Sequence, residues 1–131
     1  MVDYPVPYKT DSIYFSYNVK DYKKAVQFYT EVLGFEKGWD GGEEVGWVEF
    51  ALPMEGAKLG LNIQKEGKIE QGSGVVVLEV HDLDKTKNYF DSKNVKTTDI
   101  IDIPDMVSYF NIYDIDGNRL QAVSDPRVKS E

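Results

Sequence analysis

The sequence carries an internal repeat, which restricts the fold to one built from two similar units. The segment NVKDYKKAVQFYTEVLGF, residues 18–35, aligns with EVHDLDKTKNYFDSKNVK, residues 79–96, at an offset of 61 positions. The segment AKLGLNI, residues 57–63, aligns with NRLQAVS, residues 118–124, again at an offset of 61, and WVEFA aligns with YFNIY at an offset of 62. The shared order of elements predicts the same supersecondary unit twice.

Each copy predicts a strand, then a helix, then further strands. In the first copy, strict alternation predicts a strand at 13–19, and an apolar stripe at helical spacing after Asp21 predicts a helix that ends at Gly34. The later strands of this copy are expected near residues 35–39, 46–52 and 58–64.

The second copy predicts a strand at 75–80, a helix after Asp82, and strands at 108–113 and 119–124. The DGN sequence between the last two is typical of a tight turn, because Gly117 can adopt a positive φ. The expected fold class is therefore α+β. Two βαβββ modules in one chain form curved mixed sheets around a cleft, with the helices on the outer faces.

The length of 131 residues predicts a single domain, 1–131, with a first module at about 10–66 and a second at about 72–125. Strand alternation assigns one face of each sheet to the core under the helices and the other face to the cleft. The core of the first module is expected to contain Phe15, Tyr17, Val48, Phe50, Leu59 and Leu61.

Aromatic, acidic and amide side chains gather on the cleft face, a composition typical of small-molecule sites. The candidate ligand-binding residues are Tyr14, Trp47, Glu49, Glu79, Tyr109, Asn111 and Gln121. The aromatic rings would stack on a flat ligand, the two glutamates would pair with a cationic group, and the two amides would orient it. Trp39 lies in a glycine-rich stretch, which predicts either a flap over the cleft or an anchored loop.

The composition excludes several classes of function. The chain has no cysteine, which excludes disulfides, thiolate catalysis and cysteine-ligated metal centres, and its one histidine, His81, is expected to be a solvated loop residue. A net charge of −8 disfavours nucleic acid as a partner and favours the approach of a cationic ligand. No apolar run approaches the roughly 20 residues that span a bilayer. We therefore expect a cytoplasmic protein without membrane contact.

The paired modules, the two helix segments quoted above and the closing DIDGNRLQ resemble the vicinal oxygen chelate superfamily, also called the glyoxalase/bleomycin resistance/dioxygenase family. The resemblance covers about residues 12–124. It implies that enzymes of the family hold one divalent metal in the cleft through His, Glu or Gln at four equivalent strand positions. Those positions here are Tyr14, Gly60, Val75 and Gln121.

This chain departs from the family pattern at the implied metal site. Gly60 and Val75 offer no side-chain donor, and tyrosine is an unusual ligand for zinc, manganese or nickel, so neither a metal nor another cofactor is expected. A shifted register, or an unconventional site that uses Glu49 and Glu79, remains an alternative.

The expected function is a metal-free small-molecule-binding protein of the glyoxalase/bleomycin resistance type that sequesters a cationic or aromatic compound. One alternative is a glyoxalase-like lyase or isomerase, or a dioxygenase-related enzyme, with an unconventional or absent metal site. Glu49 or Glu79 would then be the general base, although no catalytic residue is assigned. The second alternative is a regulatory or vestigial module.

The resemblance also implies a homodimer, since two-module relatives commonly dimerise and often build each cleft from both chains. The sequence leaves open whether modules pair within one chain or between chains. The tail SDPRVKSE, residues 124–131, is polar and predicts a frayed end.

Overall fold

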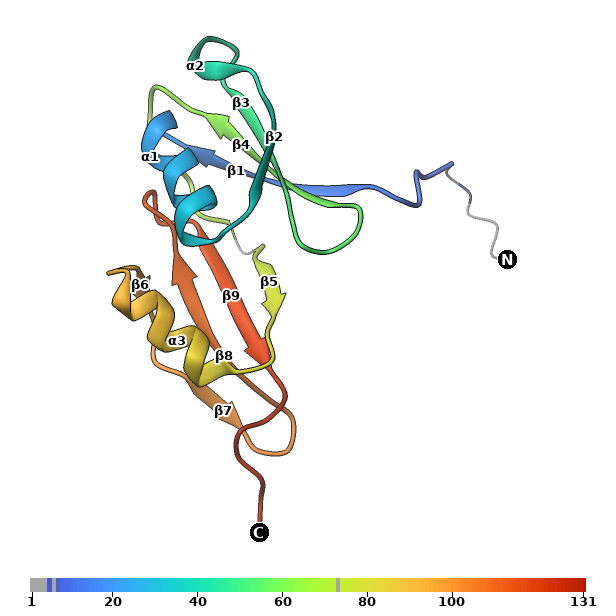
Figure 1. Cartoon of the computed structure of the whole chain (residues 1–131), viewed down its shortest axis with the longest axis vertical. Helices are drawn as coiled ribbons and strands as arrows, with labels where there is room; N and C mark the ends of the chain where they lie inside the picture. The colour runs from blue at the N-terminus through green and yellow to red at the C-terminus, as the bar shows by residue number, and fades with distance from the viewer. Residues whose placement is uncertain (1–4, 6, 73) are drawn as a thin grey trace.

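The first of two mixed sheets contains four strands in the order β1-β4-β3-β2 (Figure 1). The structure is a computed structural model that describes residues 5, 7–72 and 74–131. The strands of this sheet are β1 (Ile13–Val19), β2 (Glu36–Asp40), β3 (Trp47–Ala51) and β4 (Ala57–Ile63). The helical segments are α1 (Tyr22–Gln27), which continues as the π-helical η1 (Phe28–Val32), and the short α2 (Gly42–Val45). β1 runs parallel to β4, whereas the other neighbours are antiparallel.

The second sheet repeats this plan with the order β5-β9-β8-β6, and β7 also pairs with β8. Its elements are β5 (Val76–Glu79), α3 (Leu83–Ser92), β6 (Lys96–Thr97), β7 (Ile101–Ile103), β8 (Val107–Tyr113) and β9 (Arg119–Ser124). Again the first strand, β5, runs parallel to the last, β9. We call β1 to β4 with their helices the first module, and β5 to β9 with α3 the second. The α+β class predicted from the repeat is confirmed.

The two main helices begin with the same cap, 61 positions apart. The side chain of Asp21 accepts a hydrogen bond from the Lys24 amide at 3.0 Å, and that of Asp82 accepts one from the Lys85 amide at 3.0 Å. Each aspartate is extended and satisfies an amide that has no partner within its helix. Gly34 follows the first helix with φ +77°, a conformation that glycine adopts without strain.

The core lies between each sheet and its helix, as alternation predicts. Val48, Phe50, Leu59 and Leu61 are fully buried in the first module, and Phe110, Ile112 and Leu120 are fully buried in the second. The expectation that Phe15 belongs to this core is wrong, because this residue is 41% exposed. The N-terminal half of β1 extends beyond α1 (Figure 1), so the helix cannot cover it.

Hydrogen bonds from side chains join the two modules. The hydroxyl of Tyr29, on η1, donates to Asp114 Oδ2 at 2.9 Å. Asn118 Nδ2 donates both to Asp114 Oδ2 at 2.9 Å and to the Asn18 carbonyl at 2.9 Å. The Tyr17 hydroxyl donates to the Arg119 carbonyl at 2.7 Å. Burial raises the pKa of Tyr29 well above its ordinary value, so its hydroxyl stays a donor at neutral pH.

The C-terminal tail is held against the second module, which corrects the expectation of a frayed end. Arg127 pairs with Asp84 on α3 and with Asp102 on β7, the latter at 2.6 Å. The Arg127 amide donates to Ser108 Oγ at 3.0 Å, and the Ser108 hydroxyl donates to Asp102 at 2.6 Å. A polar composition alone did not reveal these partners, because they lie on elements far away in the sequence.

Arg127→Ala is expected to lower thermal stability modestly at neutral pH, because the ion pair is partly exposed. Arg127, followed by Ser108, lowers the pKa of Asp102 from 3.8 to about 2. The stabilisation of the folded state by the Arg127–Asp102 pair is therefore complete above about pH 4, and it is lost as the pH falls toward about 2. Thermal melts of wild type and variant should show a difference in Tm that shrinks with acidification. Lys129→Ala, in the same tail, should melt like wild type at every pH, and a pH-independent difference for Arg127→Ala would contradict the prediction.

Among the helices of the described residues, none has the length and apolar character needed to cross a membrane.

Candidate functional site

An aromatic and acidic cluster lies on the face of the first sheet opposite its helix. Trp47 and Glu49 are two positions apart on β3 and share this face. Trp47 Nε1 donates a hydrogen bond to Glu49 Oε2 at 2.8 Å, which fixes the direction of the indole. The Tyr14 ring meets Trp47 edge to face, with centroids 6.2 Å apart and an interplanar angle of 72°. We call Tyr14, Trp47 and Glu49 the tryptophan cluster.

The indole of Trp47 lies directly over Gly60 of β4. A Cβ added at Gly60 would lie 2.2 Å from Trp47 Cζ2 and 2.3 Å from Cη2, far inside van der Waals contact. Glu49 is the cross-strand partner of Gly60, so the indole reaches diagonally across the strand pair. Gly60 therefore provides the space in which the indole lies flat on the sheet.

Lys58 lies beside the tryptophan cluster, and it was not predicted as a site residue from the sequence. Its Nζ lies 5.7 Å from the centroid of the Tyr14 ring, its partner in the parallel β1–β4 register. A cation at this distance is attracted to the face of the ring. Alternation with Gly60 and Asn62 along β4 could have placed Lys58 on this face.

The second sheet brings together the two amide candidates. Gln121 Nε2 donates to Asn111 Oδ1 at 3.1 Å, and the two residues are direct partners across β8 and β9. Tyr109 lies on the same face, two positions from Asn111 on β8. On the neighbouring strand, Val77 is the partner of Gln121, and Glu79 is the partner of Val123.

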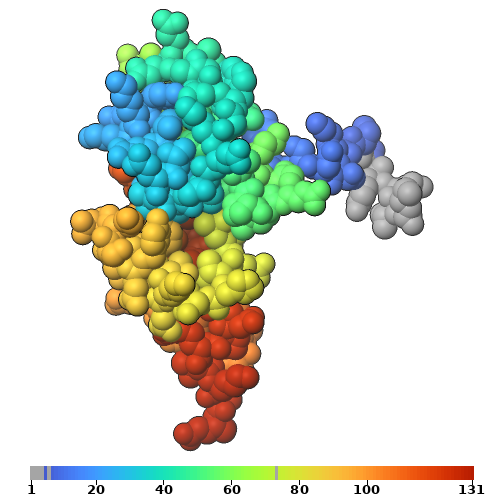
Figure 2. Space-filling view, viewed as in Figure 1, coloured from blue at the N-terminus to red at the C-terminus, as the bar shows by residue number. Residues whose placement is uncertain are grey.

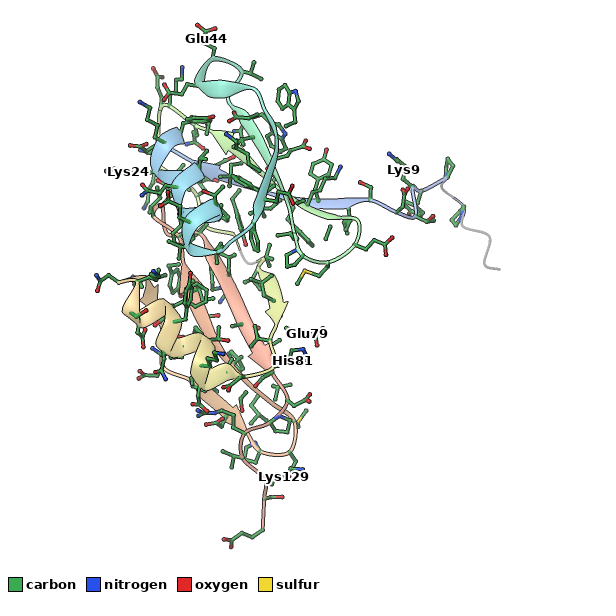
Figure 3. The ribbon with its side chains drawn as sticks, viewed as in Figure 1. Lys9, Lys24, Glu44, Glu79, His81 and Lys129 are labelled. Atoms are coloured by element: carbon green, nitrogen blue, oxygen red, sulfur yellow. The ribbon has the colours of Figure 1, made fainter. Side chains whose placement is uncertain are left out.

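Glu79 stands apart from the other candidates. It is exposed, and it lines a cavity of about 370 Å³ together with His81, Val123 and Asp125. Figure 3 shows Glu79 and His81 next to each other at the end of β5. His81 is an exposed residue of the loop before α3, as the sequence predicts.

Six of the seven candidates form two groups, one on each sheet, and Glu79 belongs to neither. Within the described residues, no hydrogen bond or ring contact connects the tryptophan cluster with Tyr109, Asn111 and Gln121. Trp39 is neither a flap nor a loop residue, because it lies within β2 and is 56% exposed. A Cβ added at Gly41 would lie 2.5 Å from Trp39 Cη2, so the ring packs back on its own turn.

The positions that hold a metal in enzymes of the resembled family do not suit one here. Gly60 has no side-chain donor and is covered by the Trp47 indole, and Val75 offers only hydrocarbon. Gln121 contributes a neutral amide that is already bonded to Asn111, and Tyr14 contributes a phenol. A divalent ion needs several converging oxygen, nitrogen or sulfur donors. In the part of the chain that the structure describes, no three acidic, His or Cys side chains come together as a metal site.

Gly60→Ala is expected to displace the Trp47 indole and to break its bond to Glu49. The added methyl group needs the space that the ring occupies. Trp39→Phe leaves Trp47 as the one tryptophan of the chain, so fluorescence and near-ultraviolet circular dichroism in that background report on this ring. Gly38→Ala is the control, because a Cβ there meets only the Glu49 carbonyl oxygen at 3.6 Å. Unchanged Trp47 spectra in Gly60→Ala would contradict the expected displacement.

Comparisons with known proteins identify the family. The family model described as the Glyoxalase/Bleomycin resistance protein/Dioxygenase superfamily matches residues 12–122. No curated protein matches the sequence.

Several solved structures share the fold. An integron cassette protein from the mobile metagenome of the Halifax Harbour sewage outfall is 22% identical, with a TM-score of 0.72 over 88% of this chain and 99% of that one. TnmS3, an antibiotic binding protein from Streptomyces sp. CB03234, is 22% identical, with a TM-score of 0.71 over 89% and 97%. Lactoylglutathione lyase from Agrobacterium tumefaciens is 17% identical, with a TM-score of 0.72 over 88% and 94%.

Identities this low show a common fold and leave activity undetermined. The family model, by contrast, spans all the strands and helices from β1 to most of β9. On this evidence the chain belongs to the glyoxalase/bleomycin resistance protein/dioxygenase superfamily.

Proposed function

We propose that this protein binds a planar aromatic compound with a positive charge, without a metal, at the tryptophan cluster. The observation that carries the proposal is the Trp47 indole, held in place by Gly60 beneath it and by the 2.8 Å bond to Glu49. A ring fixed in this way loses little conformational entropy when a ligand stacks on it. The carboxylate beside the ring supplies the negative charge that a cationic ligand would pair with.

Charge and composition support the same ligand class. The net charge of −8 attracts cations over a longer range than any single contact. Lys58 already lies over one face of Tyr14, so the proposal assigns stacking to Trp47 and an edge contact to Tyr14. The related structure of an antibiotic binding protein shows that this fold can serve binding. Lyase or dioxygenase chemistry through a metal would need donors that Gly60 and Val75 lack.

The proposal is tested by metal analysis of the purified protein beside a thermal-shift screen with probes of matched size and different charge. Berberine and ethidium are planar cations, anthracene methanol is neutral, and anthracene carboxylate is an anion. We expect the cations to raise Tm by an amount that increases with their concentration and is lost in Trp47→Ala, and we expect no such shift from the anion. Zinc, nickel or manganese bound in stoichiometric amount would overturn the metal-free proposal. Equal shifts from all probes, or no shift from either cation, would overturn the ligand class.

The proposal includes a homodimer as the functional form. Ile13, Tyr14 and Phe15 are 59%, 56% and 41% exposed, and they lie on both faces of β1. The outer edge of β1 pairs with no other strand among the described residues. An exposed apolar edge strand favours association with another chain. A second copy would cover this strand and could bring Tyr109, Asn111 and Gln121 of one chain beside the tryptophan cluster of the other.

Phe15→Asp is expected to convert a dimer into a monomer, because a charge would be placed on the exposed apolar part of the covered strand. Sedimentation velocity of wild type and variant measures the change in mass. Ile115→Asp is the control, since Ile115 is 48% exposed but lies in the turn between β8 and β9. A monomeric wild type, or a dimer unaffected by Phe15→Asp, would contradict this part of the proposal.

A further inference from the structure

A second cavity lies between the two modules, on the helix side of both sheets. It has a volume of about 460 Å³. One wall comes from the end of η1 and the connection that leads to β2, and includes Val32, Leu33 and Phe35. The opposite wall comes from β5 and α3, and includes Leu78, Val80 and Tyr89. We call this cavity the inter-module pocket, and Figure 2 shows the surface hollowed at this junction.

The inter-module pocket is separate from the tryptophan cluster. Leu78, Ile112 and Ala122 line the pocket, and they alternate along their strands with Val77, Asn111 and Gln121 of the opposite face. A molecule in the pocket therefore lies across the second sheet from the amide candidates. Its volume falls within the roughly 300–1,000 Å³ typical of small-molecule sites.

The walls of the pocket are mainly hydrocarbon and aromatic. Phe90, Ile112 and Ala122 at its base are buried core residues, exposed by 6%, 0% and 1%. Two charged residues also line it, Glu79 and Lys85, and their charges are opposite. A charged ligand would lose its hydration without a net compensating charge, whereas an uncharged apolar ligand would replace water at hydrocarbon walls.

Polar contacts between the modules hold the two walls at a fixed distance. The Tyr89 hydroxyl donates to the Val32 carbonyl at 2.5 Å, directly beside the pocket. Farther in, the Tyr29 hydroxyl bonds Asp114 at 2.9 Å. The first bond ties α3 to η1, and the second ties η1 to the end of β8, so the space between the modules is preformed rather than opened by a ligand.

We propose that the inter-module pocket is a second binding site, which takes an uncharged apolar molecule of about two fused aromatic rings. Such a ligand contacts both modules and stabilises their junction. The neutral probe N-phenyl-1-naphthylamine, which fluoresces in apolar surroundings, matches this chemistry and tests the site directly. We expect one probe to bind per chain of the wild-type protein.

Two variants change the pocket without touching the tryptophan cluster. Met54→Glu places a charge in its wall, at a residue that is 43% exposed on the turn between β3 and β4, and Thr86→Phe fills it from α3. Each should weaken probe binding by roughly tenfold or more. Met106→Glu is the matched control, because Met106 is 69% exposed and lies outside the pocket. Trp47→Ala should bind the probe like wild type, which separates this site from the proposed function.

Methyl nuclear magnetic resonance of the wild-type protein locates the probe even if a variant fails to fold. Shifts at the methyl groups of Val32, Leu78 and Val80, with none at Val77 or Val123, would support the pocket. Shifts confined to Val77 and Val123, absence of probe binding, or unchanged affinity in folded Met54→Glu and Thr86→Phe would each overturn it.

Discussion

Asp114→Ala is expected to lower the free energy of unfolding by about 3 kcal/mol, a large share of the total for a domain of this size. The Asp114 side chain accepts hydrogen bonds from the Tyr29 hydroxyl, from the Asn118 side chain, and from the backbone amides of Asp116 and Asn118. Asp114 is only 6% exposed, so water cannot fully replace the carboxylate. Alanine would leave buried donors unpaired in both modules at once.

Tyr29→Phe provides the matched comparison for the Asp114 network. It removes one donor and leaves the three other hydrogen bonds to Asp114 in place, so we expect a loss of about 1 kcal/mol. Urea unfolding followed by circular dichroism measures both variants. If Asp114→Ala were no less stable than Tyr29→Phe, the network would not be what joins the modules.

The fold could be predicted because its signals are local and occur twice. The caps at Asp21 and Asp82 are each set by one side chain and an amide three residues later, a relation that a single sequence displays. Alternation along β3, β4, β8 and β9 likewise gave the correct buried faces. The DGN turn was recognised, and Gly117 has φ +84° as the turn requires.

The errors in prediction concern contacts between distant parts of the chain. Phe15 follows the alternation of a core strand, yet it is exposed because α1 does not extend over it. The tail was expected to fray because its partners, Asp84 and Asp102, are more than twenty residues from Arg127. Asp114 was given no role from the sequence, and its bond to Tyr29 spans 85 positions. No local pattern encodes such pairs.

The sequence was enough to predict which candidate residues share a face of a sheet, but not how their side chains contact one another. Trp47 and Glu49 follow from alternation on one strand, and the structure pairs them. The position of the indole over Gly60 depends on the register between β3 and β4, which sequence pattern alone does not fix. Because of this register, Gly60, which cannot act as a metal ligand, provides the space in which the Trp47 indole lies. The assignment of these residues to ligand binding stays a prediction.

Trp47→Ala is expected to weaken binding of a planar cation such as berberine by about 2 kcal/mol, or roughly 30-fold, because stacking and cation–π attraction are lost together. Trp39→Ala is the control, since Trp39 is an exposed tryptophan outside the tryptophan cluster. Isothermal titration of wild type and both variants gives the affinities. Equal loss in the two variants would show that the binding is not specific to Trp47.

Glu49→Gln separates the charge of the site from its geometry. The glutamine carbonyl can still accept the bond from Trp47 Nε1, so the indole keeps its orientation while the negative charge is removed. Because the carboxylate is only half-buried, we expect a loss of about 1 kcal/mol, roughly fivefold, for a cationic probe and no loss for a neutral one. Titrations at low and high salt should show a weaker salt dependence in the variant than in the wild type. If Glu49→Gln bound the cation like wild type at low salt, the carboxylate would serve only to orient the indole, and the ligand would be selected for its flat ring rather than for its charge.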